Sequence, residues 1–444
     1  MKSIDPLLAA WEAVWQRKAD APAIFDPSGQ VLRSFREIEM RARDFDSQLQ
    51  TRARGEVVAI DLGNHPDWPA MLLATLRRGL IALPLDESTT APQRAAALEI
   101  FPSSQQKNPD EPAPALLKLT SGTTAAPRAI RFRSEQLLAD CEQICDTMGI
   151  TEEDVNFAVI PVSHSYGFSN LITPLLGRGV PMVLSRDRMP RAVLDDLARS
   201  KATVFPGMPV FFQAFAQMES VPDLPHLRLC ISAGAPLPLV MAQKFRAQFG
   251  RSIHSFYGSS ECGGICYDRE ARLEEPGFVG QPMQGVSVRL LDPGCAMSRI
   301  EVRSRAAGDG YIPISDPEKL SGGRFVPDDL LAVGETGYRI AGRVSDVINV
   351  AGRKVNPAEV EAVLLGFEGI REAVVFGRGS ALRNEEVAAC IVAETHFTEP
   401  ELLEYCRRRL SGWQVPKRIF FLEQMPVTER GKISRRALAE RFRA

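Results

Sequence analysis

The chain has 444 residues, 45% of them hydrophobic and 24% charged, a composition that permits a sizeable core and excludes a disordered, collagenous or coiled-coil protein. Lys and Arg number 53 against 55 Asp and Glu, a formal net charge of −2, so no overall basic field predicts nucleic acid or an anionic membrane surface as partner. At ~100–200 residues per domain, the length predicts two to four domains.

The sequence predicts neither a targeting segment nor a membrane span. Asp5 and Glu12 interrupt the start of the chain where a signal peptide needs an unbroken apolar run. Residues 170–184, the longest apolar stretch, contain Thr, Pro, Gly and Arg and cannot supply a span of ~20 residues. Two cysteine pairs have i, i+4 spacing, Cys141/Cys145 and Cys262/Cys266. Zinc is an alternative there, but no histidine or third thiol completes either pair. We expect a cytoplasmic protein with reduced thiols.

The first 86 residues alternate between helical and strand patterns. Apolar residues at helical spacing predict helices over residues 7–15 and 35–49. Residues 56–64 are typical of a buried strand, and residues 68–79 of the helix that follows it. A polar, proline-rich connector over residues 101–115 then interrupts the pattern.

Alternation resumes after this connector. We expect a strand over residues 115–120, a Gly/Thr loop, a helix from about Ser134, a strand over 156–162 and a helix near 168–176. This order predicts an α/β domain on largely parallel sheets. Short strands and turns from about Gly277 predict a β-rich subdomain, and the chain beyond Gly342 is again α+β.

A run of hydroxyl side chains follows the strand expected at residues 115–120. It consists of Thr120, Ser121, Gly122, Thr123 and Thr124, and it leads to Arg128. Hydroxyls and backbone N–H groups donate to anionic oxygens while a cation neutralises charge, so the loop suits phosphate. No Gly-Lys-Ser/Thr follows, which excludes a Walker loop. A plain surface loop is the alternative.

A second segment combines an aromatic ring, a glycine, hydroxyls and a carboxylate. It reads Tyr257-Gly258-Ser259-Ser260-Glu261 and follows a predicted strand. Tyr257 could stack on a base, and Glu261 could hold a hard cation such as Mg²⁺ through oxygen. The alternative is a solvent-exposed turn with an incidental glutamate.

Two further segments lie in the last quarter of the chain. In the first, Asp329, residues 342–346 and residues 352–359 follow in order; the second is residues 426–435, which contain Lys432. A lone lysine in a basic tail is usually only solvated. The order of all four segments, however, resembles the adenylate-forming superfamily, which comprises acyl- and aryl-CoA synthetases, adenylation domains and beetle luciferases.

That resemblance implies both a fold and a reaction. The implied fold is α/β, with a large composite N-terminal domain (residues 1–344, layered sheets plus a small β-barrel-like subdomain) and a mobile α+β C-terminal domain (residues 345–444). The family activates a carboxylic acid with ATP to an acyl-adenylate and usually transfers the acyl group to a thiol. Its cofactors here would be ATP, Mg²⁺ and CoA or a phosphopantetheine arm.

The resemblance also implies roles for individual residues. Lys432 would bridge the acid and the α-phosphate, and Glu261 would bind Mg²⁺. The ATP- and AMP-binding set would be Thr120, Ser121, Gly122, Thr123, Thr124, Arg128, Gly234, Ala235, Tyr257, Gly258, Ser260, Asp329 and Arg343. Ser345 would lie at the hinge, and the Gly352 turn would help to form the thiol channel.

His164 gives information about the carboxylic acid substrate. It lies in a Pro-x-x-His segment that resembles the CoA ligases, where amino-acid-activating relatives usually have an aspartate. This favours an acid without an α-amino group and makes His164 a candidate catalytic residue; a structural histidine is the alternative. By the same resemblance, an aryl or medium-length acyl group would contact Tyr166, Phe168, Met208, Ala233 and Gly263.

Several positions depart from the family pattern. Ala125 and Ala126 stand where a glycine is usual, Arg128 replaces a lysine, Asp329 follows Pro327-Asp328, and Ser345 replaces an aspartate. The stretch between Asp86 and Thr120 is also shorter than usual, which leaves the thiol acceptor less defined than adenylation.

We therefore predict an AMP-forming acid–thiol ligase whose partners are a small carboxylic acid, ATP and CoA. The alternatives are transfer to a carrier protein's phosphopantetheine or to an amine, and, in a different class, an inactive binding or scaffold homologue. Motifs alone do not separate these acceptors.

Overall fold

The computed structural model describes residues 5–101, 114–120, 128–273, 275–380, 384–395, 397–426 and 433–442. The chain divides into two compact units. The first unit comprises Met1–Arg289, Glu301–Pro327 and Glu335–Tyr338. The second comprises Leu290–Ile300, Asp328–Gly334 and Arg339–Ala444. Segments on both sides of the expected boundary at residues 344 and 345 thus belong to the second unit.

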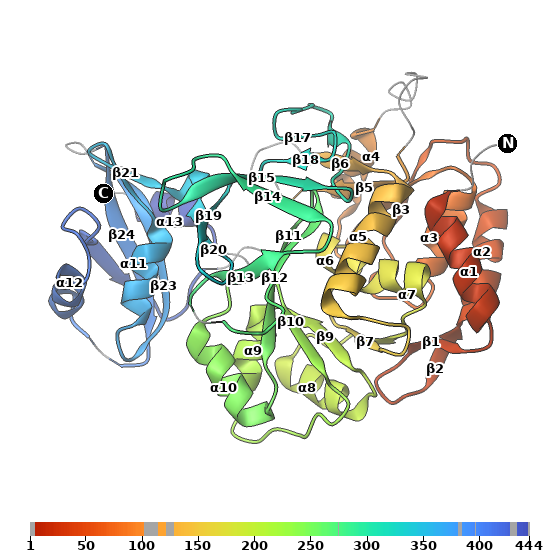
Figure 1. Ribbon diagram of the computed structural model, residues 1–444, viewed down its shortest axis with the longest axis horizontal. Helices are drawn as coiled ribbons and strands as arrows, with labels where there is room; N and C mark the ends of the chain where they lie inside the picture. The colour runs from red at the N-terminus through yellow and green to blue at the C-terminus, as the bar shows by residue number, and fades with distance from the viewer. Residues whose placement is uncertain are drawn as a thin grey trace. The chain divides into compact units, whose positions relative to one another are not determined.

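The first unit contains a long, mostly parallel sheet with the strand order β13-β12-β11-β10-β9-β7-β8-β1-β2 (Figure 1). Neighbours from β1 through β8, β7, β9 and β10 to β11 pair in parallel, and the outer pairs are antiparallel. The strands are β1 Pro22–Phe25, β2 Val31–Ser34, β7 Asn156–Ala158, β8 Met182–Leu184, β9 Val204–Gly207, β10 Leu229–Ser232, β11 Ile253–Ser259, β12 Gly263–Tyr267 and β13 Phe278–Pro282.

A second sheet in the same unit has the order β16-β6-β5-β4-β3. Its strands are β3 Val57–Ile60, β4 Ile81–Pro84, β5 Leu116–Leu119, β6 Ala129–Phe132 and β16 Gly310–Ile312. β3, β4 and β5 are parallel, whereas β6 and β16 are antiparallel to their neighbours. β16 therefore brings residues 310–312 beside the strand that follows the expected phosphate loop.

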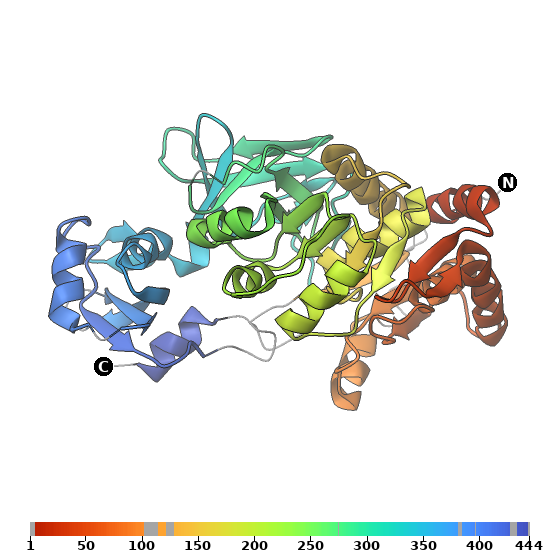
Figure 2. The ribbon, with the colours of Figure 1, turned by 90° about the horizontal axis from the view of Figure 1, so that it is seen from below.

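Helices cover these sheets. They are α1 Pro6–Lys18, α2 Phe35–Gln48, α3 Trp68–Arg77, α4 Ala91–Glu99, α5 Ser134–Met148, α6 Ser165–Gly167, α7 Thr173–Arg178, α8 Pro190–Arg199, α9 Pro209–Ala216 and α10 Leu239–Phe249. Residues of α8, α9 and α10 share one apolar core with the parallel strands of the long sheet (Figure 2). α5 is buried along most of its length, and its buried acidic residue Asp140 faces the functional site described below.

The chain after Gly277 forms short strands, as expected. They are β14 Val286–Leu290, β15 Ser298–Ser304, β17 Leu320–Ser321, β18 Arg324–Phe325, β19 Asp329–Val333 and β20 Tyr338–Arg343. The second unit adds a sheet of order β22-β21-β24-β23, with β25 beside β24. Its elements are a short helix Val344–Asp346, β21 Ile348–Val350, β22 Arg353–Val355, α11 Pro357–Leu365, β23 Ile370–Ser380, β24 Asn384–Ala393, α12 Glu399–Arg407, β25 Arg418–Phe421 and α13 Arg435–Arg441. The predicted mixed α/β class with a smaller α+β part is confirmed.

One predicted strand is shorter than the sequence suggested. The strand expected over residues 156–162 ends at Ala158, because Asn64 binds the backbone that follows. The Asn64 side-chain amide donates to Ala158 O at 3.3 Å and to Ile160 O at 3.1 Å, and its oxygen accepts from Val162 N at 3.0 Å. These buried bonds replace ladder bonds and direct the chain toward His164.

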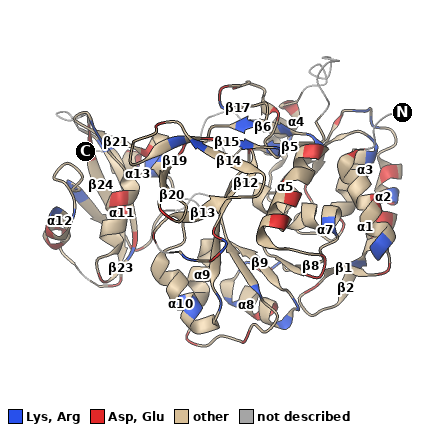
Figure 3. Cartoon of the chain, in the orientation of Figure 1, with Lys and Arg blue, Asp and Glu red and all other residues tan. Residues whose placement is uncertain are grey.

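Charges of both signs are interspersed over the described chain in the view of Figure 3, which fits the small net charge. In the part of the chain that the structure describes, no helix has the length and apolar character needed to cross a membrane.

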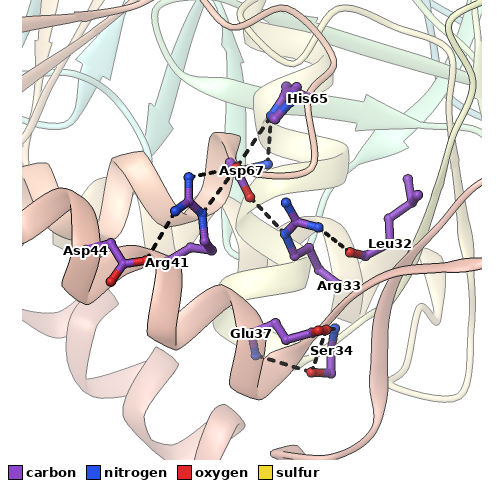
Figure 4. A network of polar contacts seen from close by, with 8 residues as sticks. All are labelled: Leu32, Arg33, Ser34, Glu37, Arg41, Asp44, His65 and Asp67. Carbon is purple, nitrogen blue, oxygen red and sulfur yellow. Dashed lines mark hydrogen bonds and ion pairs between the residues drawn. The ribbon is translucent and has the colours of Figure 1, made fainter.

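Asp67, at the start of α3, is the centre of a polar network (Figure 4). Its carboxylate accepts from Arg33 Nε at 2.9 Å and from Arg41 Nε and Nη2 at 3.3 Å. Its backbone N–H donates to His65 Nδ1 at 3.1 Å. Burial raises the pKa of Asp67, but the two guanidinium groups outweigh burial and hold the pKa below its ordinary value. The network joins the β1–β2 hairpin, α2 and α3.

We predict that Asp67→Asn lowers the free energy of unfolding by about 1–3 kcal/mol, because a buried charged acceptor is lost. Urea unfolding at neutral pH measures this loss, and Asp44→Asn, which removes only an exposed partner of Arg41, should cost about 0–1 kcal/mol. Since the pKa of Asp67 is lowered in the folded state, its stabilisation is present above the ordinary carboxyl pKa and disappears as pH falls through the folded-state pKa. If the loss of unfolding free energy in Asp67→Asn stayed constant as the pH fell, it would contradict a role for the Asp67 charge.

Candidate active site

The carboxyl ends of parallel strands bring several predicted residues to one edge of the long sheet. β9, β10 and β11 run in the same direction, so the chain leaves them at Met208, at Ala233 and at Ser260. Ligands of α/β proteins bind at this edge, where the loops are free of the sheet ladder. Ala233 is buried, while Gly234 and Ala235 are exposed beyond it. The two exposed residues are thus placed where a nucleotide base could contact backbone.

The ends of the expected phosphate loop are fastened together. Thr120 N donates to Arg128 O at 2.8 Å, and Thr120 Oγ1 donates to the same oxygen at 3.3 Å. These bonds extend the β5–β6 ladder by one step and fix both residues at the mouth of the loop. Ser121, Gly122, Thr123 and Thr124 lie outside the described residues, so their contacts to phosphate stay a prediction.

Glu261 occupies the turn between β11 and β12. The Tyr311 hydroxyl donates to Glu261 Oε1 at 3.1 Å, and the Glu261 N–H donates to Ser259 Oγ at 3.2 Å. Burial raises the pKa of this carboxyl group above its ordinary value, although the Tyr311 bond opposes the shift. Among the described residues Glu261 has no ion pair to Lys or Arg within 4.0 Å. A partly buried carboxylate without a paired cation among these residues fits Mg²⁺, which binds one or two carboxylates and completes its shell with phosphate oxygens and water.

The hairpin β11–β12 tolerates only glycine at two of its positions. A Cβ on Gly258 would lie 2.8 Å from Gly263 O, and a Cβ on Gly263 would lie 2.0 Å from Asp140 Oδ1. Gly263 has φ +69°, and Gly264 N donates to Asp140 Oδ1 at 3.0 Å. Gly263 is therefore needed for close packing of the turn on α5, which is a structural reason for a residue that we assigned to the acyl pocket.

Tyr257 and Ser260 flank this turn. Tyr257 is 6% exposed and pairs with Cys266 across the hairpin, so little of its ring is open to solvent in this structure. Ser260 Oγ accepts from Ser165 Oγ at 2.9 Å, which ties the Glu261 turn to α6. The aromatic and hydroxyl residues of the Tyr257–Glu261 segment thus lie between the sheet edge and the His164 loop.

The residues expected to contact the acid are not all brought together. The Tyr166 hydroxyl donates to Gly207 O and Ile231 O, each at 3.3 Å, which places it against β9 and β10 near Met208 and Ala233. Phe168, in contrast, is 1% exposed, and its ring packs 5.9 Å from Trp68. Phe168 is a core residue in this structure.

His164 is exposed, and its Nε2 lies 3.8 Å from Asp86 Oδ2. Asp86 follows β4 of the second sheet, so this contact joins the ends of the two sheets. Burial raises the pKa of Asp86, but hydrogen bonds from Ser88 and the nearby His164 leave it below its ordinary value. Asp86 belongs to none of the four motif segments, and it was not predicted as a site residue from the sequence.

The second unit holds the remaining predicted residues. Arg343 Nε donates to Asp329 Oδ1 at 2.9 Å, so the two residues assigned to the ribose lie together. Ser345 Oγ donates to Asp346 Oδ1 at 3.1 Å. Gly352, at φ +84°, forms the β21–β22 turn and donates its N–H to Asn349 Oδ1 at 2.9 Å. Lys432 lies outside the described residues.

Besides Asp86, two further residues of the first unit were missed by the motifs. Tyr311 contacts both Glu261 and Arg128, whose guanidinium carbon is 4.2 Å from the ring centroid. Lys118, on β5, is 6% exposed, and its ammonium lies 4.7 Å from the Phe132 ring and 5.2 Å from that of Phe168. Burial lowers the pKa of Lys118, and Asp140 and Glu261 are among the charges that oppose the shift. A polar residue in the otherwise apolar strand Leu116–Leu119 was the available signal for Lys118.

Comparison with known proteins identifies the family. A family model described as AMP-binding enzyme matches residues 11–104 and 94–308, and one described as AMP-binding enzyme C-terminal domain matches residues 359–432. The chain belongs to this family. The resemblance to the adenylate-forming superfamily is thereby confirmed.

Individual relatives of this AMP-binding enzyme match over most of its length. It is 29% identical to benzoate–CoA ligase of Thauera aromatica over 88% of this chain and 78% of that protein. It is 27% identical to 3,4-dihydroxybenzoate–[aryl-carrier protein] ligase of Bacillus anthracis over 73% of each. In fold it is similar to ATP-bound MatB from Rhodopseudomonas palustris, with a TM-score of 0.85, 24% identity and 98% of each chain covered.

We predict that Gly263→Ala destabilises this AMP-binding enzyme far more than Gly250→Ala does. Both glycines have left-handed backbones, at φ +69° and +63°, and that conformation costs an alanine about 1–2 kcal/mol. Only the Gly263 variant forces a methyl group onto Asp140, which adds about 1–3 kcal/mol of overpacking. Thermal unfolding of both variants measures the difference, and equal midpoints would show that the Asp140 contact does not hold the turn.

Proposed function

We propose that the protein joins a carboxylic acid without an α-amino group, an aryl or medium-length acyl acid, to the thiol of CoA through an acyl-adenylate. The curated relatives named above are acid–thiol ligases, and the predicted enzyme class agrees with theirs. The observation that carries the proposal is the joint placement of Glu261, Ser260 and the two ends of the Thr120–Arg128 loop at the strand ends of the first unit.

The first half-reaction needs negative charges to approach each other. An oxygen of the acid forms a bond to the α-phosphorus of ATP, and pyrophosphate leaves with the electron pair of the broken P–O bond. Mg²⁺ bound to Glu261 would neutralise phosphate charge when present. Donors at the Thr120 loop would hold the β- and γ-phosphates, and Arg128 would add a fixed positive charge at its end. Lys432 would stabilise the charge that develops between acid and α-phosphate.

In the second half-reaction, the acceptor thiolate attacks the acyl carbon, and AMP leaves. We propose that the second unit turns about Ser345, withdraws Lys432 and contributes the Gly352 turn to the thiol channel. A change of neighbours between the half-reactions lets one site serve both. Asp329 and Arg343, already paired, would bind the ribose through the carboxylate. The eight cysteines are all free thiols, which fits the reducing cytoplasm that we propose as the location.

Acid-dependent exchange of pyrophosphate into ATP tests the first half-reaction. Across aryl, medium-chain and short-chain acids we expect exchange with one class only, AMP rather than ADP as the nucleotide product, and a loss of about 10²–10³-fold in Glu261→Gln, the size typical of one lost electrostatic contact. Exchange with amino acids would contradict the inference from His164. Absence of exchange with every acid, together with retained ATP binding, would support the scaffold alternative.

A panel of acceptors then decides the second half-reaction. The carrier-protein relative makes a phosphopantetheine arm the main competitor, so CoA, a pantetheinylated aryl-carrier domain and simple amines are compared with the preferred acid. Thioester formation with CoA supports the proposal. Turnover with the carrier domain and none with CoA would replace it.

We predict that Lys432→Ala reduces exchange about 10²–10³-fold and still converts a supplied acyl-adenylate to thioester, within a few-fold of the unmodified enzyme. Lys417→Ala removes an exposed lysine of the same unit and serves as the matched control with neither defect. Equal losses in both half-reactions of Lys432→Ala would contradict a lysine that acts in adenylation alone.

A further inference from the structure

Arg128 has a nitrogen that this structure leaves without a partner. Its Nε is buried and makes no hydrogen bond among the described residues, whereas its Nη2 donates to Ile314 O at 3.4 Å. A buried donor left unsatisfied costs about 1–3 kcal/mol, so such groups normally have a partner. An N–H at the mouth of the expected phosphate loop is suited to an anionic oxygen of the ligand.

Tyr311 holds this guanidinium in place. The guanidinium carbon lies 4.2 Å from the centroid of the ring, within the range of a cation–π contact. Tyr311 pairs with Ile130 in the β6–β16 ladder, two residues beyond Arg128, so the paired backbones of these two strands place the ring beside the arginine. A planar guanidinium stacks on a ring in a way that a lysine ammonium does not reproduce.

The same tyrosine holds the carboxylate of Glu261. Its hydroxyl donates to Oε1 at 3.1 Å, and the Ser259 hydroxyl is a second hydrogen-bonding neighbour of the carboxylate. The Tyr311 bond restrains the orientation of the carboxylate and leaves lone pairs of its oxygens for a metal ion. Partners of this kind orient metal ligands, and their loss typically reduces metal affinity about 10–100-fold.

We infer that Tyr311 is a positioning residue that sets the phosphate-binding cation Arg128 and the metal-binding carboxylate Glu261 relative to each other, so that one side chain prepares the binding of the metal–triphosphate complex. The inference rests on the proposed function only for the identity of the ligand. It also gives a reason for arginine at position 128, where the family resemblance leads one to expect lysine: with Tyr311 beneath it, the flat guanidinium is the better-held cation.

Three substitutions separate the two contacts. Tyr311→Phe keeps the ring under Arg128 and removes the hydroxyl; Tyr311→Leu removes both contacts; Arg128→Lys keeps the charge and loses the planar stack. Arg409 and Tyr405 supply a matched control in the second unit, because the Arg409 guanidinium carbon lies 3.7 Å from the Tyr405 ring. Tyr405→Phe and Arg409→Lys test whether any arginine–tyrosine stack would give the same result.

The measurement is equilibrium binding, which needs no turnover. Calorimetry with the ATP–Mg²⁺ complex and electron paramagnetic resonance with Mn²⁺ in the presence of ATP report the two ligands separately. We expect Tyr311→Phe to weaken Mn²⁺ about 10-fold or more with a smaller effect on ATP in the absence of metal. We expect Arg128→Lys to weaken metal-free ATP several-fold and to leave Mn²⁺ affinity nearly unchanged. Thermal unfolding midpoints verify that each variant is folded.

A double-substitution cycle tests whether Tyr311 contributes to ATP binding through its contact with Arg128. Arg128→Lys should cost much less ATP affinity in the Tyr311→Leu background than in the native protein, because the stack is already absent. Additive losses, or a Tyr311→Phe variant with native Mn²⁺ affinity, would overturn the inference. If these binding results hold while no acid supports pyrophosphate exchange, the proposed function fails and the role of Tyr311 stands.

Discussion

The partly buried carboxylate of Glu261 is the constraint on which the candidate site depends. Moving an ionised carboxyl group out of water is expensive unless hydrogen bonds or an opposite charge compensate. The Tyr311 hydroxyl, the Ser259 hydroxyl and the charge of Lys319 favour the charged form of Glu261, but burial outweighs them and raises the pKa of the carboxyl group. Burial thus disfavours the charged form of Glu261, and a bound cation would favour that form.

The surrounding packing serves to hold that carboxylate where the strands end. The turn packs closely on Asp140 of α5 through Gly263 and Gly264. A side chain at Gly263 would overlap the Asp140 carboxylate. Ser165 joins the turn to α6, and the β16 strand places Tyr311 beside it. Three elements that are distant in sequence thus converge on one turn. A rigid support of this kind keeps a catalytic group in position without reorganisation during the reaction.

The sequence allowed the element types and the order of the chemical segments to be predicted, because periodicity and motif spacing are local properties. The helix expected over residues 68–79 forms as Trp68–Arg77, and that over 35–49 as Phe35–Gln48. Contacts between distant segments could not be predicted. The strand after Asn156 stops early because Asn64, far away in the chain, takes its hydrogen bonds. Tyr311 and Asp86 belong to no motif and acquire their partners only in the folded chain, and Phe168 lies in the core although its neighbour Tyr166 faces the strand ends.

The second unit shows how a pivot can be confined to few residues. Asp346 binds Arg435 at 2.8 Å, and Arg435 also binds Glu361 at 2.8 Å and Val375 O at 3.0 Å. These contacts fasten the end of the short helix Val344–Asp346 to α11, β23 and α13 of the same unit. Arg343, in contrast, is held by Asp329. Ser345 lies between these anchors, and its side chain bonds only to its neighbour Asp346. The Val344 N–H also donates to Asp328 O at 2.8 Å, so a rotation about the proposed hinge would have to be absorbed at Ser345, within the second unit.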